Sequence, residues 1–344
     1  MAKVLVTGVS GYIGCHVSQH LLSLGFKVTG TVRSAAKAEQ VRASLAALLQ
    51  PAQRENLSFA IVDDIAVEGA FDSAVRDGGF EFVVHTASPF TYAIQDPQRD
   101  LIDPAVNGTT GVLKSVLKYG GSVKRIVVTS SMAAIRNTPT ANPDGLSELD
   151  WNNAAIKAFN EMGAETPAGI AYSASKTLAE KAAWAFLEQN KCAFDLVTIN
   201  PPFVFGPPIH PCSAPENLNT SVKLIWDMYV GAIKEVNPAL AAGCVDVRDV
   251  ARAHALALSN PEAGGQRFIT SSGPYTQTLV RQVLQKRFPG RSYATGELAA
   301  VPVAELNAKS KRVLGMGEYI GLEESIVDTV NACIDRFGDV KSVL

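Results

Sequence analysis

The sequence predicts an α/β fold, in which helices cover both faces of a doubly wound parallel sheet and a smaller mixed α/β lobe lies beside it. The first half of the chain alternates short apolar runs with amphipathic segments, which is typical of βαβ units. The second half changes in character after Asn200, where prolines become frequent. The 344 residues, 47% hydrophobic and 19% charged, are enough to bury a large core.

Short apolar runs mark the strands that we expect in the main sheet. They are Lys3–Thr7, Lys27–Val32, Ser58–Val62, Phe82–Thr86, Arg125–Ser130 and Phe194–Asn200. Segments between them, such as His16–Leu24 and Val106–Tyr119, predict helices. Parallel strands are buried on both faces, which explains why Val4–Val6 and Ile126–Val128 are continuously apolar.

Crowded prolines interrupt this pattern between residues 201 and 215, where no ordinary helix or central strand fits. We expect a structured loop there, then a helix at Ser221–Val230, then a strand end and helix at Val245–Leu258 that return to the main sheet. Residues 1–200 and 243–270 are therefore predicted to form the larger domain. Residues 201–242 and 271–344 are predicted to form the smaller lobe.

Charge, hydropathy and cysteine content exclude several classes of protein. The formal net charge is −2 and the cations are scattered, so we expect no nucleic-acid partner. No apolar run approaches the roughly 18 residues of a membrane span, and the amino terminus reads as a strand and not as a signal peptide. The five cysteines are far apart and lack CxxC spacing, so we expect free thiols, no metal site and a cytoplasmic protein.

A glycine-rich turn joins the first predicted strand to the first helix. Gly8 suits the tight turn, Gly11 allows close approach of a pyrophosphate, and Gly14 allows the helix to pack against the strand. The spacing GxxGxxG matches the common fingerprint only in part, but its place at the start of a βαβ unit predicts a Rossmann-type dinucleotide site. The residues of this loop are Gly8, Val9, Ser10, Gly11, Tyr12, Ile13 and Gly14.

Two cations favour NADPH over NADH. An NAD site usually ends its second strand with an acidic residue, whereas this chain has Arg33, followed by Lys37 one helical turn later. A guanidinium matches a phosphate, so a 2′-phosphate is the natural partner, although both cations could simply be solvated at the surface. Asp64 and Ile65 follow the third strand, where they could flank an adenine or form an ordinary polar loop.

Tyr172 and Lys176 lie four residues apart on one predicted helix, so their side chains share a face. A phenol titrates near 10 in water, and a neighbouring ammonium favours its ionised form. Ser130 and Ser131 end the fifth strand, at the edge where open α/β sheets bind ligands. Spacing does not decide which serine faces a substrate. Serine, tyrosine and lysine together predict a carbonyl reductase.

These motifs resemble the extended short-chain dehydrogenase/reductase family. The sequence is similar to its dihydroflavonol-reductase branch and, within it, to fungal NADPH-dependent methylglyoxal/isovaleraldehyde reductases. The matching motifs are VTGVSGYIG, TVRS, HTASPF, PAVNGT, VVTSS, YSASK, NPPFVFGP and DVRDVARAH. The resemblance implies catalytic roles for Ser131, Tyr172 and Lys176. It implies cofactor contacts at Gly8 to Gly14, Arg33, Lys37, Asp64, Ile65, Thr86, Ala87, Tyr172, Lys176, Pro201, Pro202, Phe203, Val204 and Ser221.

The motifs place apolar side chains around the reacting carbon. We expect Phe90, Met132, Phe203 and Trp226 to line the substrate pocket, although some of them could simply belong to the core. Such a pocket suits aldehydes, α-dicarbonyls and aryl or alkyl ketones as small-molecule partners. Residues 135–171 and 209–217, which we expect to border the substrate, match no motif.

Other interpretations remain open from sequence alone. A nucleotide-sugar epimerase shares the fold and the three catalytic residues, but usually holds NAD. A non-catalytic NADP-sensing protein has little reason to keep all three, and a steroid dehydrogenase is disfavoured by the lack of a membrane segment. His85 and His254 are expected to be packed residues, and Asp246 and Asp249 to cap a helix. We expect a monomer or a homodimer.

Overall fold

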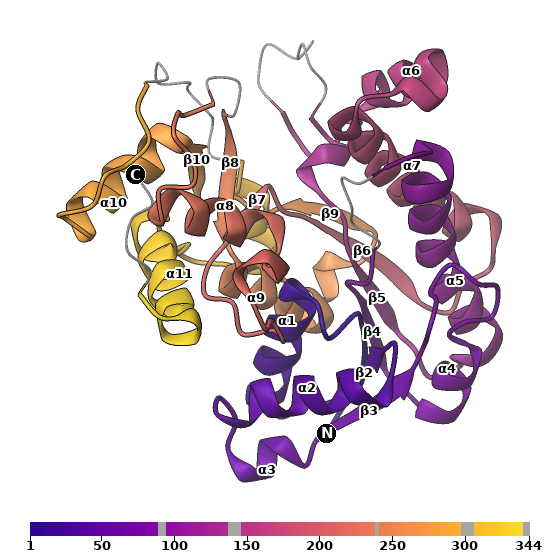
Figure 1. The fold of residues 1–344 in the computed structure, drawn as a ribbon. Helices are drawn as coiled ribbons and strands as arrows, with labels where there is room; N and C mark the ends of the chain where they lie inside the picture. Colours follow the sequence, from indigo (N-terminus) through magenta and orange to yellow (C-terminus); the bar gives the residue numbers. More distant parts are fainter. Residues whose placement is uncertain (89–93, 137–145, 238–240, 297–305, 340–344) are drawn as a thin grey trace.

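Seven parallel strands form the central sheet, in the order β3-β2-β1-β4-β5-β6-β9 (Figure 1). The structure is a computed structural model that describes residues 1–88, 94–136, 146–237, 241–296 and 306–339. The strands of this sheet are β1 (Lys3–Thr7), β2 (Lys27–Val32), β3 (Leu57–Ile61), β4 (Phe82–His85), β5 (Arg125–Thr129), β6 (Asp195–Asn200) and β9 (Gln266–Ile269). The six strands expected from the sequence are all present, within one residue of their predicted ends.

Continuous apolar strands form because each face of the sheet has its own core. Val4 and Val6 of β1 belong to one buried cluster, whereas Leu5 between them belongs to the cluster on the opposite face. The alternation follows from the period of two residues along a strand. Both faces are covered by helices (Figure 1), which confirms the predicted doubly wound α/β class.

The helices divide between the two faces of the sheet and the smaller lobe (Figure 1). Helix α1 packs beside α9 on one face, and α5 packs beside α4 and α7 on the other. The helices are α1 (Tyr12–Ser23), α2 (Ala35–Ala46), α3 (Pro51–Arg54), α4 (Asp72–Gly78), α5 (Asp103–Tyr119), α6 (Asn153–Met162), α7 (Ala168–Gln189), α8 (Thr220–Tyr229), α9 (Val247–Ser259), α10 (Gln277–Arg287) and α11 (Leu322–Phe337).

A three-stranded sheet in the order β10-β8-β7 forms the smaller lobe, together with α8, α10 and α11. Its strands are β7 (Phe203–Phe205), β8 (Ala241–Asp246) and β10 (Gly273–Thr276). The chain thus leaves the main sheet after β6, returns for β9 and leaves again. The strand end at residues 245–246 is expected in the main sheet, but it pairs with β7 of the smaller sheet, whereas residues 241–244 of the same strand pair with β10. The helix that follows, α9, packs on the main sheet as expected.

Several helices begin earlier than their sequence pattern suggests. Helix α1 begins at Tyr12, and α7 begins at Ala168, so Tyr172 lies one turn inside its helix instead of opening it. The residues before them, Gly11 and Pro167, supply no side-chain cap, so no polar residue marks either start. Helix α5 begins at Asp103, with a proline in its first turn where the missing N–H has no cost.

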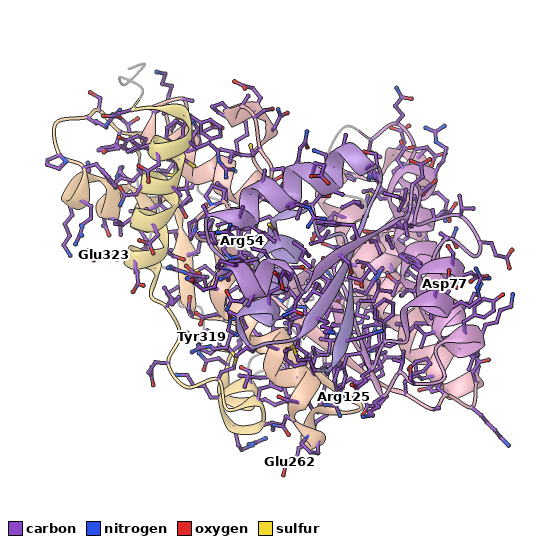
Figure 2. The ribbon with its side chains drawn as sticks, turned by 90° about the horizontal axis from the view of Figure 1, so that it is seen from below. Arg54, Asp77, Arg125, Glu262, Tyr319 and Glu323 are labelled. Carbon is purple, nitrogen blue, oxygen red and sulfur yellow. The ribbon has the colours of Figure 1, made fainter. Side chains whose placement is uncertain are left out.

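The amino-terminal ends of β5 and β6 are joined by a charge pair that lies away from the glycine turn. Arg125 donates from Nε to Asp195 Oδ1 over 2.6 Å and from Nη2 to Asp195 Oδ2 over 2.8 Å. Its Nη1 also donates to the carbonyl oxygen of Ala257 over 2.6 Å. Figure 2 shows Arg125 on the same side of the molecule as Glu262, which follows α9. The pair therefore ties the two strands to the carboxyl end of α9.

Candidate active site

The glycine turn after β1 is shaped by positions where only glycine fits. Gly8 has a φ of +71°, and a Cβ there would lie 2.8 Å from Ala87 Cα. A Cβ on Gly14 would overlap the Gly8 carbonyl oxygen and lie 2.6 Å from Thr86 Oγ1. Gly11, in contrast, is exposed, and its N–H donates to the Gly8 carbonyl over 2.9 Å. The turn is therefore compact on its inner side and open at Gly11.

The amino terminus of α1 offers unpaired backbone donors beside this open position. Gly11 is its N-cap, no side chain caps the helix, and its first turn contains no acidic residue. The first N–H groups of a helix, together with its dipole, bind phosphates well. The turn therefore fits the pyrophosphate of a dinucleotide, as the loop Gly8–Gly14 predicted.

The end of β4 is fastened to the same turn. Thr86 Oγ1 donates to the Thr7 carbonyl over 2.7 Å, and the Ala87 N–H donates to Thr7 Oγ1 over 3.2 Å. These bonds place Thr86 and Ala87 against the glycine turn, where the resemblance expected cofactor contacts. The hydroxyl of Tyr12, at the start of α1, donates to the Gly206 carbonyl over 2.9 Å, and His16 Nε2 lies 2.8 Å from the Pro207 carbonyl oxygen. The turn is thus also joined to the proline-rich segment.

The two cations after β2 are both exposed. Ser34 caps α2 by accepting from the Lys37 N–H over 3.3 Å, so Arg33 precedes the helix and Lys37 lies in its first turn. Lys37 Nζ donates to Gln40 Oε1 over 2.9 Å. Within the described part of the chain, neither cation forms an ion pair with a carboxylate. Both charges are available to an anion.

Other expected cofactor contacts lie at the same edge of the sheet. Asp64 Oδ1 accepts from the Ala66 N–H over 2.9 Å, and Ile65 packs against Gly108 of α5. Ser221 Oγ donates to the Val204 carbonyl over 2.5 Å, which ties α8 to β7. The remaining expected contacts, Pro201, Pro202, Phe203 and Val204, run from the end of β6 into β7.

Tyr172 and Lys176 lie one turn apart on α7, with Lys176 Nζ 5.7 Å from the centre of the Tyr172 ring. Lys176 Nζ donates to Ser88 Oγ over 2.8 Å. Burial lowers the pKa of Lys176 to about 8, so its ammonium predominates at neutral pH but titrates readily above it. The sequence analysis missed Ser88; its position two residues after Thr86 in the HTASPF motif is the only signal for it.

The two serines after β5 differ in their environment. Ser130 is buried, and its hydroxyl donates to Glu180 Oε2 over 2.5 Å. Ser131 is half-buried and precedes a short 3₁₀ turn that contacts α7; its Oγ accepts from the Ala133 N–H over 3.0 Å. A hydroxyl that accepts one bond keeps its own proton to donate. The geometry therefore favours Ser131 as the serine that holds a carbonyl oxygen.

The residues expected to line a substrate pocket are not all brought together. Met132 follows Ser131 and is half-buried, as is Phe203, whose ring lies 5.3 Å from that of Tyr275. Trp226 is only 3% exposed and packs against Tyr229 and Phe337 in the core of the smaller lobe. The expectation for Trp226 is therefore wrong, because a core side chain has no surface left for a ligand. Phe90 lies outside the described residues.

The residues that we interpreted as structural are indeed held inside. His85 is buried with Nδ1 2.9 Å from Thr7 Oγ1, and burial and the charge of Lys176 lower its pKa to about 3. His254 is buried with Nε2 2.7 Å from Thr129 Oγ1. Asp246 caps α9 by accepting from the Arg248 N–H. Asp249 does not cap it; its Oδ2 accepts from the Ile320 N–H over 2.7 Å.

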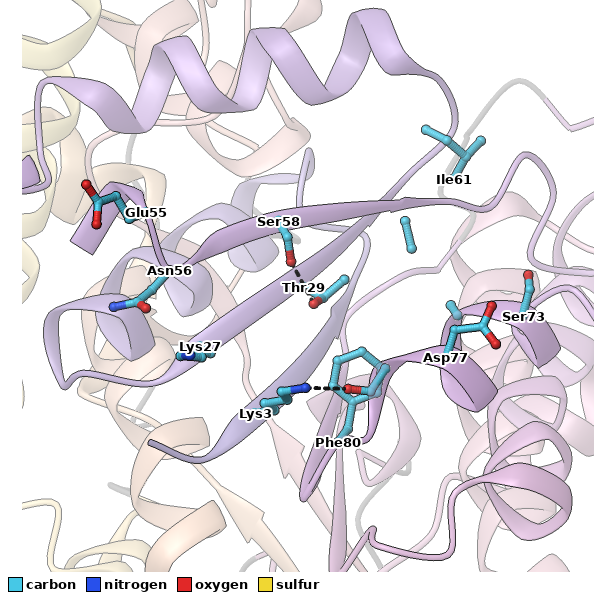
Figure 3. Close-up of a pocket in the computed structure, with 13 residues that line it drawn as sticks. Lys3, Lys27, Thr29, Glu55, Asn56, Ser58, Ile61, Ser73, Asp77 and Phe80 are labelled. Carbon is cyan, nitrogen blue, oxygen red and sulfur yellow. Dashed lines mark hydrogen bonds between the residues drawn. The ribbon is translucent and has the colours of Figure 1, made fainter. Parts of the chain in front are cut away.

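A separate groove lies on the outer strands of the sheet (Figure 3). It measures about 490 Å³ and is lined by side chains of β1, β2, β3 and α4. Its charged residues, among them Lys3, Lys27, Glu55 and Asp77, are exposed and of both signs. None of the residues of the glycine turn or of the serine–tyrosine–lysine set lines it. The groove therefore has no part in the site described above.

Comparison with known proteins identifies the family. The model of the NAD dependent epimerase/dehydratase family matches residues 4–270. The chain belongs to this family. It is 36% identical to the NADPH-dependent methylglyoxal reductase of Saccharomyces cerevisiae, over 98% of this chain and 100% of that one. It is 37% identical to a ketoreductase of Aspergillus niger, over 97% and 98% of the two chains.

Solved structures of family members extend the comparison to three dimensions. The crystal structure of yeast methylglyoxal/isovaleraldehyde reductase complexed with NADPH matches with a TM-score of 0.86 and 35% identity. The match covers 98% of this chain and 100% of that one, so both lobes are included. Among the helices that the structure describes, none is long and apolar enough to cross a membrane. The described residues also contain no group of three or more His, Cys, Asp or Glu side chains arranged to hold a metal ion.

Proposed function

We propose that the protein is an NADPH-dependent carbonyl reductase that converts aldehydes and ketones to alcohols. The observation that carries the proposal is the half-buried Lys176 one turn from Tyr172 on α7, beside the turn that Ser131 begins. The relatives named as a methylglyoxal reductase and a ketoreductase support it, since each aligns with nearly the whole chain.

The residues of the glycine turn and the two exposed cations fit an NADPH molecule. The open position at Gly11 would receive the pyrophosphate, and Arg33 and Lys37 would receive the 2′-phosphate. NADPH supplies the hydride that is transferred to the carbonyl carbon. The larger domain, predicted as residues 1–200 and 243–270, would hold the cofactor. The smaller lobe, predicted as residues 201–242 and 271–344, would supply the rest of the carbonyl pocket; β8 spans the boundary between the two at residue 243.

Two side chains would act on the carbonyl oxygen, and a third would support one of them. Ser131 donates a hydrogen bond that fixes the oxygen, and Tyr172 transfers its phenolic proton to the same oxygen as the carbon accepts the hydride. The Lys176 ammonium stabilises the phenolate that remains until a proton from solvent restores the phenol. The products are an alcohol and the oxidised cofactor. Met132 and Phe203 give the pocket apolar walls, which suits neutral carbonyl compounds.

A direct assay tests the proposal. NADPH oxidation is followed with purified protein and a panel that contains methylglyoxal, branched aldehydes, aryl ketones, 2-oxo acids and nucleotide sugars. We expect neutral aldehydes and ketones to be reduced fastest, and Tyr172→Phe to lower kcat by about a hundredfold or more. Epimerisation of a nucleotide sugar without net oxidation of NADPH would show an epimerase instead. NADPH binding without turnover of any carbonyl would show a sensing protein.

We also propose a cytoplasmic location and a monomeric or homodimeric state. All five cysteines are free in the structure, which supports a reducing compartment. Localisation of a tagged chain in cells tests the first statement, and light scattering of the purified protein tests the second.

A further inference from the structure

Glu180 is a buried carboxylate that the proposed mechanism does not use. It lies on α7 one turn after Lys176 and two turns after Tyr172, so all three side chains project from one face of the helix. Its side chain is 1% exposed. A carboxylate buried to this degree is costly unless it is paired and hydrogen-bonded. Its partners therefore indicate why it is there.

The first group of partners comes from the carboxyl ends of β5 and β6. Glu180 Oε2 accepts from Ser130 Oγ over 2.5 Å and from Asn200 Nδ2 over 2.8 Å. Its Oε1 accepts from Thr198 Oγ1 over 2.9 Å. Asn200 Nδ2 also donates to the Ser131 carbonyl over 3.3 Å. One carboxylate thus joins the helix of Tyr172 and Lys176 to the strand end that carries Ser131.

The charge of Glu180 is balanced by Arg267 on β9. Arg267 is 8% exposed, and its Nε donates to Glu180 Oε1 over 2.6 Å. Its Nη1 donates to the carbonyl oxygens of Glu148 and Asp150, each over 2.7 Å, and its guanidinium lies 3.7 Å from the centre of the Trp151 ring. The pair therefore extends from α7 to the segment 148–152, one of the two regions that match no sequence motif.

This segment in turn contacts the turn that follows Ser131. Asn152 Nδ2 donates to the Ala133 carbonyl, and its backbone N–H donates to the Ala134 carbonyl, each over 2.9 Å. Ala133 is the residue whose N–H donates to Ser131 Oγ. Hydrogen bonds thus hold Ser131 from both sides: through Ser130 and Asn200 to Glu180, and through Ala133 and Asn152 to the segment fixed by Arg267.

We propose that Glu180, with Arg267, is a positioning residue that sets the place of Ser131 relative to Tyr172 and Lys176. The proposal rests on the proposed reductase function. A buried ion pair contributes little net stability compared with apolar packing, so its value lies in the geometry that it fixes. Catalytic groups must be held within a fraction of an ångström of their working positions, and misplacement by about 1 Å can cost about a hundredfold in rate.

The chain supplies a matched control on the same two strands. Arg125 and Asp195 pair at the amino-terminal ends of β5 and β6, whereas Glu180 binds the opposite ends. Asp195→Asn therefore also removes the charge of a carboxylate that holds β5 to β6, and it touches no group of the proposed site. Asp195 is 41% exposed, so Glu180→Gln should destabilise the fold more than Asp195→Asn does. A purely structural role for Glu180 nevertheless predicts that the folded variants have the same kcat.

The experiment compares both variants with the wild type by thermal unfolding, by NADPH affinity from fluorescence and by kcat and KM for a neutral ketone. We expect both variants to unfold at a lower temperature and to bind NADPH within about twofold of the wild type. Only Glu180→Gln should lose kcat, by between about tenfold and a hundredfold. A folded Glu180→Gln protein with the kcat of Asp195→Asn would overturn the proposal.

Ser130→Ala keeps the test decisive if Glu180→Gln does not fold. It removes one donor to Glu180 and leaves the ion pair with Arg267 intact, so it should fold and lose several-fold in kcat without a change in NADPH affinity. Full kcat in Ser130→Ala would then overturn the proposal. If wild type and Asp195→Asn both fail to reduce any carbonyl, the proposed reductase function fails, and positioning fails with it. An active wild type beside an equally active Glu180→Gln refutes positioning alone.

Discussion

Replacing Arg33 with alanine should separate the binding of NADPH from that of NADH. Arg33 is exposed and forms no ion pair with a carboxylate among the described residues, so the change removes a charge without leaving a partner unpaired. One hydrogen bond to a charged group contributes about 1.5–3 kcal/mol, which corresponds to about ten- to a hundredfold in affinity. Solvent screens an exposed guanidinium, so we expect the lower end of this range.

The assay measures dissociation constants for both cofactors by nicotinamide fluorescence at low and at high salt. Arg33→Ala should weaken NADPH about tenfold and leave NADH within about twofold, and the loss should shrink as salt increases. Arg42→Ala is the matched control, because Arg42 is an exposed arginine on α2, the helix that Arg33 precedes, and it pairs with its neighbour Glu39 at 3.7 Å. Equal weakening of NADPH and NADH by Arg33→Ala, or an equal effect of Arg42→Ala, would refute the assignment of the 2′-phosphate.

Three further outcomes are expected of the proposed site. Tyr172→Phe should lower kcat by about a hundredfold or more in the NADPH assay while NADPH affinity stays unchanged; a variant that keeps most of its activity would disprove the proton donor. Because burial lowers the pKa of Lys176 to about 8, the ammonium is lost as pH rises through that value, so kcat/KM for reduction should fall above about pH 8; a profile that stays flat to about pH 10 would contradict this role. Phe203→Ala should shift the preference toward bulkier ketones or change the enantiomeric ratio of the alcohol; because Phe203 is also an expected cofactor contact, NADPH affinity is measured beside it, and a change in NADPH affinity with unchanged substrate preference would place Phe203 outside the pocket.

The main sheet could be predicted because local sequence determines it. A parallel strand buried on both faces tends to be continuously apolar, as in Val4–Val6 between Lys3 and Thr7 and in Ile126–Val128 between Arg125 and Thr129. The glycine turn was equally clear, because Gly8 and Gly14 occupy positions that exclude a Cβ. Both features depend on residues that are close together in the chain.

Features that depend on distant residues could not be predicted. The sequence of residues 245–246 suggests a strand end of the main sheet, but these residues pair with Val204 and Phe205 in the smaller sheet. The burial of Trp226 could not be predicted, because it is covered by Phe337, which is more than a hundred residues away in the sequence. Glu180 and Arg267 are 87 residues apart, and the sequence around each of them does not indicate that they form a buried ion pair.

The path of the chain between its two sheets has a consequence for synthesis of the protein. Strand β6 comes before β7, α8 and β8 of the smaller lobe in the sequence, whereas its partner strand β9 comes after them. The side chains of Tyr12 and His16 on α1 form hydrogen bonds with the carbonyl groups of Gly206 and Pro207, which also come after β6. When the first 200 residues have left the ribosome, one edge of the sheet is still open, and helix α1 lacks two of its anchors. The amino-terminal half is therefore not expected to fold fully by itself. The main sheet is complete only after the smaller lobe's strands β7 and β8 have been synthesised and β9 has paired with β6.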